Sequence, residues 1–186
     1  MPPLLLLRLR GTYRLDRSCA VFDIIVFHTK LEINRVTTLN ANITISNIKI
    51  IDKVADSVVV GHSAGGHLAL LAGGEIDQLK GVIALAPITN IKAYARGDNS
   101  CQKVTQDFMQ GMPTDKPKAY TQANPSEQPL HPQSIILQGD QDAIVPAFNL
   151  EQLKRPVVML EGVGHFDWIH PGSAAFNTLI QNLNEM

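Results

Sequence analysis

The most constraining feature of the chain is the segment Gly61-His62-Ser63-Ala64-Gly65, which matches G-x-S-x-G. It follows the run Val58–Val60, which predicts a buried strand, and precedes His67–Ala72, which predicts a helix. On such a strand-to-helix turn the motif is typical of a nucleophile elbow, where a strained backbone lifts the serine hydroxyl above the sheet. Only small residues fit two positions before and after the serine, which explains the two glycines.

A serine nucleophile needs a base, and the base needs a carboxylate to orient it. Asp142 follows the apolar run Ile135–Leu137, and His165 follows the apolar run Val157–Leu160. Active sites of open parallel sheets form at the carboxyl ends of strands. The chain order Ser, Asp, His is the order expected for an α/β-hydrolase fold. We therefore predict Ser63 as the nucleophile, Asp142 as the acid and His165 as the base.

Each of these residues also has a simpler interpretation. The motif can be a glycine-rich turn with an incidental serine, and His165 taken alone can be a surface histidine. Asp140 lies closer to its strand than Asp142 and is better placed to cap the turn, so Asp142 is preferred. The occurrence of all three residues, in order and at strand ends, favours the catalytic interpretation.

The remaining histidines compete as bases, but their positions favour other roles. His62 adjoins the serine and is expected to pack or to line the pocket. His67 lies on the first turn of the predicted helix and is expected to be structural. His131 and His170 precede prolines in loops and are expected to be solvated.

Apolar runs alternate with helical or irregular stretches from about residue 55 onward. This pattern predicts an α/β fold with a mostly parallel central sheet and helices on both faces. The last segment, Ser173–Leu183, has the apolar spacing of a helix. Residues 88–133 are polar and rich in proline, which predicts a cap or lid-like insertion. Within it we expect short helices around Gln102–Met109 and Pro117–Gln122.

The first part of the chain is harder to interpret. Val21–Phe27 predicts a strand, although Asp23 interrupts it, and Asn40–Ile51 alternates isoleucines with polar residues. We expect residues 1–54 to be a poorly defined N-terminal segment with reduced or irregular strands. Residues 55–186 are expected to form the catalytic core of the same domain.

Composition excludes several classes of protein. The formal net charge is −1, which argues against a nucleic-acid partner. Arg8 and Arg10 interrupt the apolar run Leu4–Leu7, which is too short for a signal sequence or a membrane span. Cys19 and Cys101 make no disulfide framework and are expected to be reduced. We therefore expect a cytoplasmic protein with no metal, no cofactor and no membrane partner.

Four stretches carry a resemblance to a known family, and they extend over residues 57 to 186 nearly continuously: VVVGHSAGGHLALLAG, QDFMQGMPTDKPKAYTQANPSEQP, ILQGDQDAIVP and GVGHFDWIHP. They resemble the α/β-hydrolase superfamily and, more narrowly, the arylformamidase-like (kynurenine formamidase-like) esterases. The resemblance implies hydrolysis of a carboxylic ester or an N-formyl amide. It places the nucleophile at Ser63, the acid at Asp142 and the base at His165.

The resemblance fails upstream of the elbow. Such enzymes usually carry a His-Gly-Gly segment whose backbone N–H groups supply a second oxyanion donor, and this sequence has none. The nearest approach to it is Val26–Thr29. We expect the Ala64 N–H to be the first donor, and His62 and His28 to be further oxyanion or substrate-binding residues. The loss of one donor typically lowers the rate by about 10²–10³-fold.

These observations leave three hypotheses open. The first is an active esterase or formamidase whose N-terminal part is truncated or rewritten, with a small ester or formamide as substrate. The second is a catalytically impaired remnant that acts as a binding or interaction protein. The third is a peptidase, which is disfavoured because such enzymes usually add a substrate-gating domain. Loss of early strands could also expose a sheet edge and favour a homodimer.

Overall fold

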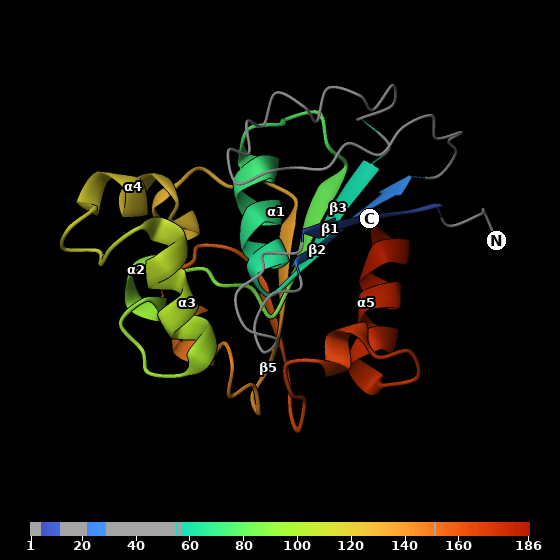
Figure 1. Ribbon diagram of the computed structural model, residues 1–186. Helices are drawn as coiled ribbons and strands as arrows, with labels where there is room; N and C mark the ends of the chain where they lie inside the picture. Colours follow the sequence, from blue (N-terminus) through green and yellow to red (C-terminus); the bar gives the residue numbers. More distant parts are fainter. Residues whose placement is uncertain (1–4, 12–21, 29–54, 56, 151) are drawn as a thin grey trace.

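The computed structural model describes residues 5–11, 22–28, 55, 57–150 and 152–186. Within them, strands form one sheet in the order β1 to β6, with helices on both of its faces (Figure 1). The strands are β1 (Leu5–Gly11), β2 (Phe22–His28), β3 (Ser57–His62), β4 (Gly81–Leu85), β5 (Ser134–Gly139) and β6 (Val157–Leu160). The helices are α1 (Ala64–Gly74), α2 (Ile91–Tyr94), α3 (Ser100–Met109), α4 (Pro117–Gln122) and α5 (Ala174–Glu185), with the short 3-10 helices η3 (Pro125–Glu127), η4 (Ala147–Leu150) and η5 (Asp167–Ile169).

The sheet is parallel from β3 to β6, whereas β2 runs antiparallel to both β1 and β3. The α/β fold with a mostly parallel sheet is therefore confirmed. The strand predicted at Val21–Phe27 begins one residue later, as β2. The strand β1 was not predicted, and Asn40–Ile51 lies outside the described residues.

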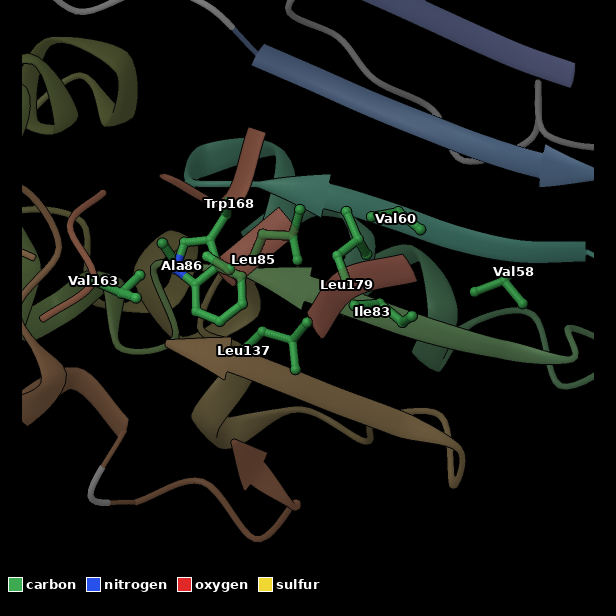
Figure 2. Close-up of a cluster of buried hydrophobic side chains, with 10 residues drawn as sticks. Val58, Val60, Ile83, Leu85, Ala86, Leu137, Val163, Trp168 and Leu179 are labelled. Atoms are coloured by element: carbon green, nitrogen blue, oxygen red, sulfur yellow. The ribbon is translucent and has the colours of Figure 1, made fainter. Parts of the chain in front are cut away.

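Alternation along the strands gives the sheet two apolar faces. One face packs against α5 and η5, and Figure 2 shows Trp168 and Leu179 set against side chains of β3, β4 and β5. This cluster contains Val58, Val60, Ile83, Leu85, Ala86, Leu137, Val163, Trp168, Ala175 and Leu179. The continuous apolar runs in the sequence predicted a parallel sheet covered on both faces, and this packing agrees with that prediction.

The opposite face packs against α1, which lies across the sheet from α5 (Figure 1). Its cluster contains Val59, Ala69, Leu70, Leu79, Val82, Ala84, Ile136 and Leu150. Sequence neighbours such as Val58 and Val59 therefore belong to different clusters, as the two-residue period of a strand requires.

The segment 88–133 forms its own small helical layer on the α1 side of the sheet (Figure 1). Both expected helices are present, as α3 and α4. A third apolar cluster forms the core of this layer. Its buried members are Ile88, Ile91, Tyr94, Ala95, Tyr120 and Val145. Since Val145 belongs to the β5–β6 connection, this cluster joins the helical layer to the segment that follows β5.

Among the described helices, none combines the length and the apolar character needed to cross a bilayer. Cys101, in the first turn of α3, is disulfide-bonded, so the expectation that it is a reduced thiol is wrong.

Two histidines are buried in the scaffold. The Nδ1 of His67 in α1 donates to the Ile88 carbonyl oxygen at 2.9 Å, and burial lowers the pKa of this imidazole to about 4. His67 is therefore structural, as expected. His131 is only 3% exposed and its Nδ1 accepts a hydrogen bond from the Gln133 N–H, so the expectation that it is solvated was wrong. His170 is exposed, as expected.

Gly61→Ala is expected to destabilise the fold severely. A Cβ at Gly61 would lie 2.1 Å from the Gly65 carbonyl oxygen, which is backbone and cannot swing aside. The expected loss in free energy of unfolding is about 3 kcal/mol or more, measured by denaturant unfolding. Gly164→Ala is the matched control, since its Cβ would meet nothing closer than 3.5 Å. Equal stabilities of the two variants would contradict the prediction.

The buried neutral His67 should make stability depend on pH. Its folded pKa of about 4 lies below the unfolded value of 6.5, so between these values only the unfolded chain binds the proton. The free energy of unfolding should therefore fall as the pH falls, by about 2–3 kcal/mol between pH 7 and pH 4.5. His67→Asn keeps an amide donor for the Ile88 carbonyl and should reduce this loss. His170→Asn, at an exposed position, should retain the full dependence; identical pH profiles for all three proteins would exclude His67 as its source.

Candidate active site

Ser63 occupies the turn between β3 and α1 in a strained conformation. Its φ of 58° and ψ of −122° lie in a region that non-glycine residues rarely adopt. The surrounding structure holds this geometry, because the Ser63 N–H donates to the Leu85 carbonyl oxygen at 2.8 Å and the Ser63 carbonyl accepts from the His67 N–H at 3.1 Å. The backbone at Gly61 and Gly65 approaches too closely for a side chain at residue 61. These are the properties predicted for a nucleophile elbow.

Ala64 is the first residue of α1. A backbone N–H in the first turn of a helix has no partner within the helix, and the helix N-terminus favours negative charge. The position therefore suits the predicted role of the Ala64 N–H as an oxyanion donor. That role stays a prediction.

Asp142 lies in the connection between β5 and β6, and its carboxylate is buried among donors. Oδ1 accepts from the Ile144 N–H at 2.9 Å and the Val145 N–H at 2.8 Å. Oδ2 accepts from the Gln138 amide nitrogen at 3.2 Å. The Asp142 residue is 5% exposed. A buried charge is tolerated only when hydrogen bonds replace its water shell, and this carboxylate has them.

His165 follows β6 and meets Asp142 directly. Its Nδ1 lies 2.7 Å from Asp142 Oδ2, with 5% of the histidine side chain and none of the aspartate side chain exposed. Because an ionised carboxylate only accepts, Nδ1 carries the hydrogen, and Nε2 is left with the lone pair that a base requires. Two of the three residues predicted to act together are thus in contact.

His62 links the histidine segment to the elbow. Its Nε2 donates to the His165 carbonyl oxygen at 2.8 Å, and the two imidazole rings lie 4.5 Å apart between centroids. Since His62 immediately precedes Ser63, this contact brings the base next to the nucleophile turn. Among the hydrogen bonds of the described residues, none joins the Ser63 hydroxyl to the His165 ring. Such bonds are often long before substrate binds.

Asp140 has the alternative role that its position suggested. It is exposed, and its Oδ1 accepts from the Gly162 N–H at 2.7 Å, across the turn after β6. The structure therefore places Asp142, and not Asp140, against the imidazole.

Gln138 is a site residue that the sequence analysis missed. It is 1% exposed near the end of β5, and its amide nitrogen faces the Gly139 and Val145 carbonyls as well as Asp142 Oδ2. All three partners are acceptors, so the amide can only present its nitrogen to them. A glutamine inside an otherwise apolar strand was the available signal, since a buried polar side chain needs partners.

The acid and base segments also touch through their backbones. The Gln141 N–H donates to the Val163 carbonyl oxygen at 3.0 Å. A Cβ on Gly139 would lie 2.1 Å from that same oxygen. Gly139 is therefore required for the two segments to approach each other, a second feature that the sequence analysis did not identify.

His28 does not reach this site. Its backbone pairs with Ser57, at the start of β3, whereas Ser63 follows the end of that strand. Six residues of extended chain correspond to about 20 Å. The antiparallel register of β2 thus contradicts the expected role of His28 in the oxyanion hole or in substrate binding. Thr29 lies outside the described residues.

A metal site is not evident in the described part of the chain, where no three His, Cys, Asp or Glu side chains gather as ligands would. The polar contacts around Asp142 and His165 are hydrogen bonds between protein groups. The arrangement suits proton transfer between side chains and nucleophilic attack by a serine.

Three solved structures are similar to this chain. A puromycin hydrolase is 22% identical with a TM-score of 0.55, over 75% of this chain and 22% of its own. A puromycin-hydrolyzing peptidase of Mycobacterium tuberculosis is 23% identical with a TM-score of 0.52, over 75% and 22%. A bifunctional GH43-CE protein of Bacteroides eggerthii is 17% identical with a TM-score of 0.51, over 68% and 23%. At these identities the likeness shows the α/β-hydrolase fold.

The chain spans less than a quarter of the length of each of these proteins. No curated protein matches its sequence. A protein-family model does match, over residues 48–165, which is more than half of the chain and includes Ser63, Asp142 and His165. The chain therefore belongs to the prolyl oligopeptidase family.

Proposed function

We propose that this chain is the catalytic part of a serine hydrolase that cleaves acyl bonds through a covalent intermediate. The observation that carries the proposal is the buried contact of 2.7 Å between His165 Nδ1 and Asp142 Oδ2, next to a serine held at a strained strand-to-helix turn. Membership of the prolyl oligopeptidase family supports the same chemistry.

In this mechanism His165 Nε2 takes the proton of the Ser63 hydroxyl as Oγ attacks the substrate carbonyl carbon. The oxyanion that forms is stabilised by the Ala64 N–H and the first turn of α1. The tetrahedral intermediate collapses, and His165 protonates the departing alcohol or amine. Water, activated by His165, then releases the acid and restores Ser63. Asp142 holds the imidazole tautomer and stabilises its cationic form throughout.

The proposed substrate is a carboxylic ester or an N-formyl amide. The support comes from the sequence stretches that resemble arylformamidase-like esterases, above all GHFDWIHP around His165. Both substrates have an unhindered carbonyl and a leaving group that one protonated imidazole can assist.

A second candidate is the hydrolysis of a peptide-like amide. The family match and the two similar puromycin-hydrolysing proteins favour it, although the sequence analysis had disfavoured a peptidase. Puromycin and N-formylkynurenine therefore belong in one substrate panel with p-nitrophenyl acetate. The impaired-remnant hypothesis is less favoured, because the acid keeps its backbone donors and its direct contact with the base.

Ser63→Ala and Asp142→Asn are expected to abolish most of the turnover on whichever substrate of the panel is cleaved. The serine variant loses the nucleophile, and the asparagine variant cannot hold the His165 tautomer, each at a cost of about 10⁴-fold or more in kcat. Initial rates and labelling by a fluorophosphonate probe measure the effect.

Asp140→Asn is the matched control, because it alters an exposed aspartate two residues away and retains an oxygen acceptor for the Gly162 N–H. It should retain kcat within about twofold. Labelling of Ser63→Ala as strong as that of the parent protein would refute the assignment of the nucleophile.

A further inference from the structure

We propose that Tyr94 and Asn99 are positioning residues for the acid Asp142, so that the helical segment 88–133 orients the proton relay instead of serving only as a wall of the pocket. The proposal rests on the function proposed above. It extends that function by adding two residues that do not touch Asp142 and act through Ile144.

The link is the backbone of Ile144. Its N–H donates to Asp142 Oδ1 at 2.9 Å. Its carbonyl oxygen accepts from the Tyr94 hydroxyl at 3.1 Å and from the Asn99 amide nitrogen at 3.2 Å. Both donors belong to the helical segment, one to the end of α2 and the other to the residue before α3. The Ile144 carbonyl shares one rigid peptide unit with the Val145 N–H, which donates to Asp142 Oδ1 at 2.8 Å. Fixing this carbonyl therefore holds the Val145 N–H toward the carboxylate and restricts residue 144, whose own N–H donates to the same oxygen.

Both donors are themselves held in place. Tyr94 is 1% exposed and packs in the cluster that includes Ile88, Ile91 and Val145. Burial and the nearby charge of Asp142 raise the pKa of its phenol, so the hydroxyl keeps the proton that it donates. A hydroxyl without this bond would be a buried polar group without a partner, which is unfavourable.

Asn99 is fixed by a capping box at the start of α3. Its Oδ1 accepts from the Gln102 N–H at 2.8 Å, and its own N–H donates to Gln102 Oε1 at 3.0 Å. With Oδ1 engaged in the cap, the amide nitrogen is the group left to face the Ile144 carbonyl. One asparagine therefore caps the start of α3 and supports the acid segment at the same time.

The test uses Tyr94→Phe, Asn99→Ser and the double variant. Serine keeps an acceptor for the helix cap but lacks the amide donor. Tyr120→Phe is the matched control, because Tyr120 is also a fully buried tyrosine of the helical segment whose hydroxyl donates to a backbone carbonyl, that of Gly111, at 3.0 Å. It removes the same kind of bond, but the acceptor of that bond lies outside the acid segment.

Each single variant should lower kcat about 3- to 10-fold with little change in KM. The double variant should lower kcat by more than the product of the two single effects, since either bond alone can still hold the Ile144 carbonyl. The control should remain within about twofold of the parent. Two results together would overturn the proposal. The kcat of each single variant would equal that of the control, and the fold-decrease in kcat of the double variant would not exceed the product of the two single decreases.

Hydrogen exchange of the Ile144 and Val145 amides provides a readout that needs no turnover. These two N–H groups bind Asp142, so their exchange should accelerate at least about tenfold in the double variant and stay unchanged in Tyr120→Phe. A merely structural role would accelerate exchange in α2 and α3 and leave these two amides protected, which would also overturn the proposal. If the parent protein shows no turnover, the proposed function fails, but the exchange comparison still decides whether Tyr94 and Asn99 hold the amides that bind Asp142. If the double variant does not fold, the exchange rates of the single variants decide the same question.

Discussion

The parallel alignment of β3 through β6 is the constraint on which the candidate site depends. Because these strands run the same way and in close register, His62, Leu85, Gly139 and Leu160 end them at one edge of the sheet. The serine turn, the aspartate segment and the histidine segment each begin at that edge. Strand pairing thus brings together residues separated by about a hundred positions in the chain.

Hydrogen bonds to main-chain groups hold most of the side chains of the site in position. The Asp142 carboxylate receives two main-chain N–H groups, and the imidazole of His62 is tied to the main chain at His165. Main-chain donors are part of rigid connections and lose little conformational freedom on binding, unlike long side chains. The site is consequently built into the course of the chain, and few side chains outside it need to be specified.

The parts of this molecule that could be predicted from sequence are those governed by local pattern. The apolar run Val157–Leu160 coincides with β6, and Pro117–Gln122 coincides with α4, because a uniform run or a proline at the first turn sets the boundary locally. The serine turn was predictable for a related reason. Gly61 is required by a close contact with the backbone of Gly65, only four residues away in the chain.

The errors concern residues whose surroundings are set by distant parts of the chain. His28 was placed near the serine by likeness to a motif, but the antiparallel register of β2 decides its position. His131 precedes a proline, as exposed loop residues often do, yet it lies against Gly73 of α1 and is buried. Gln138 offers only the signal of a polar residue in an apolar strand, and Ile144 offers none. Their roles arise only when the β5–β6 connection meets the imidazole and the helical segment.

The contact between Gly139 and Val163 limits where residues can be inserted into or deleted from this chain. The loop bearing the acid and the loop bearing the base cross with no clearance and share a main-chain hydrogen bond. A residue inserted where the two loops cross would displace one loop or the other, so the chain is constrained at this point from both sides. The connection between β4 and β5, already long and helical, lies away from the crossing and leaves more freedom for insertions.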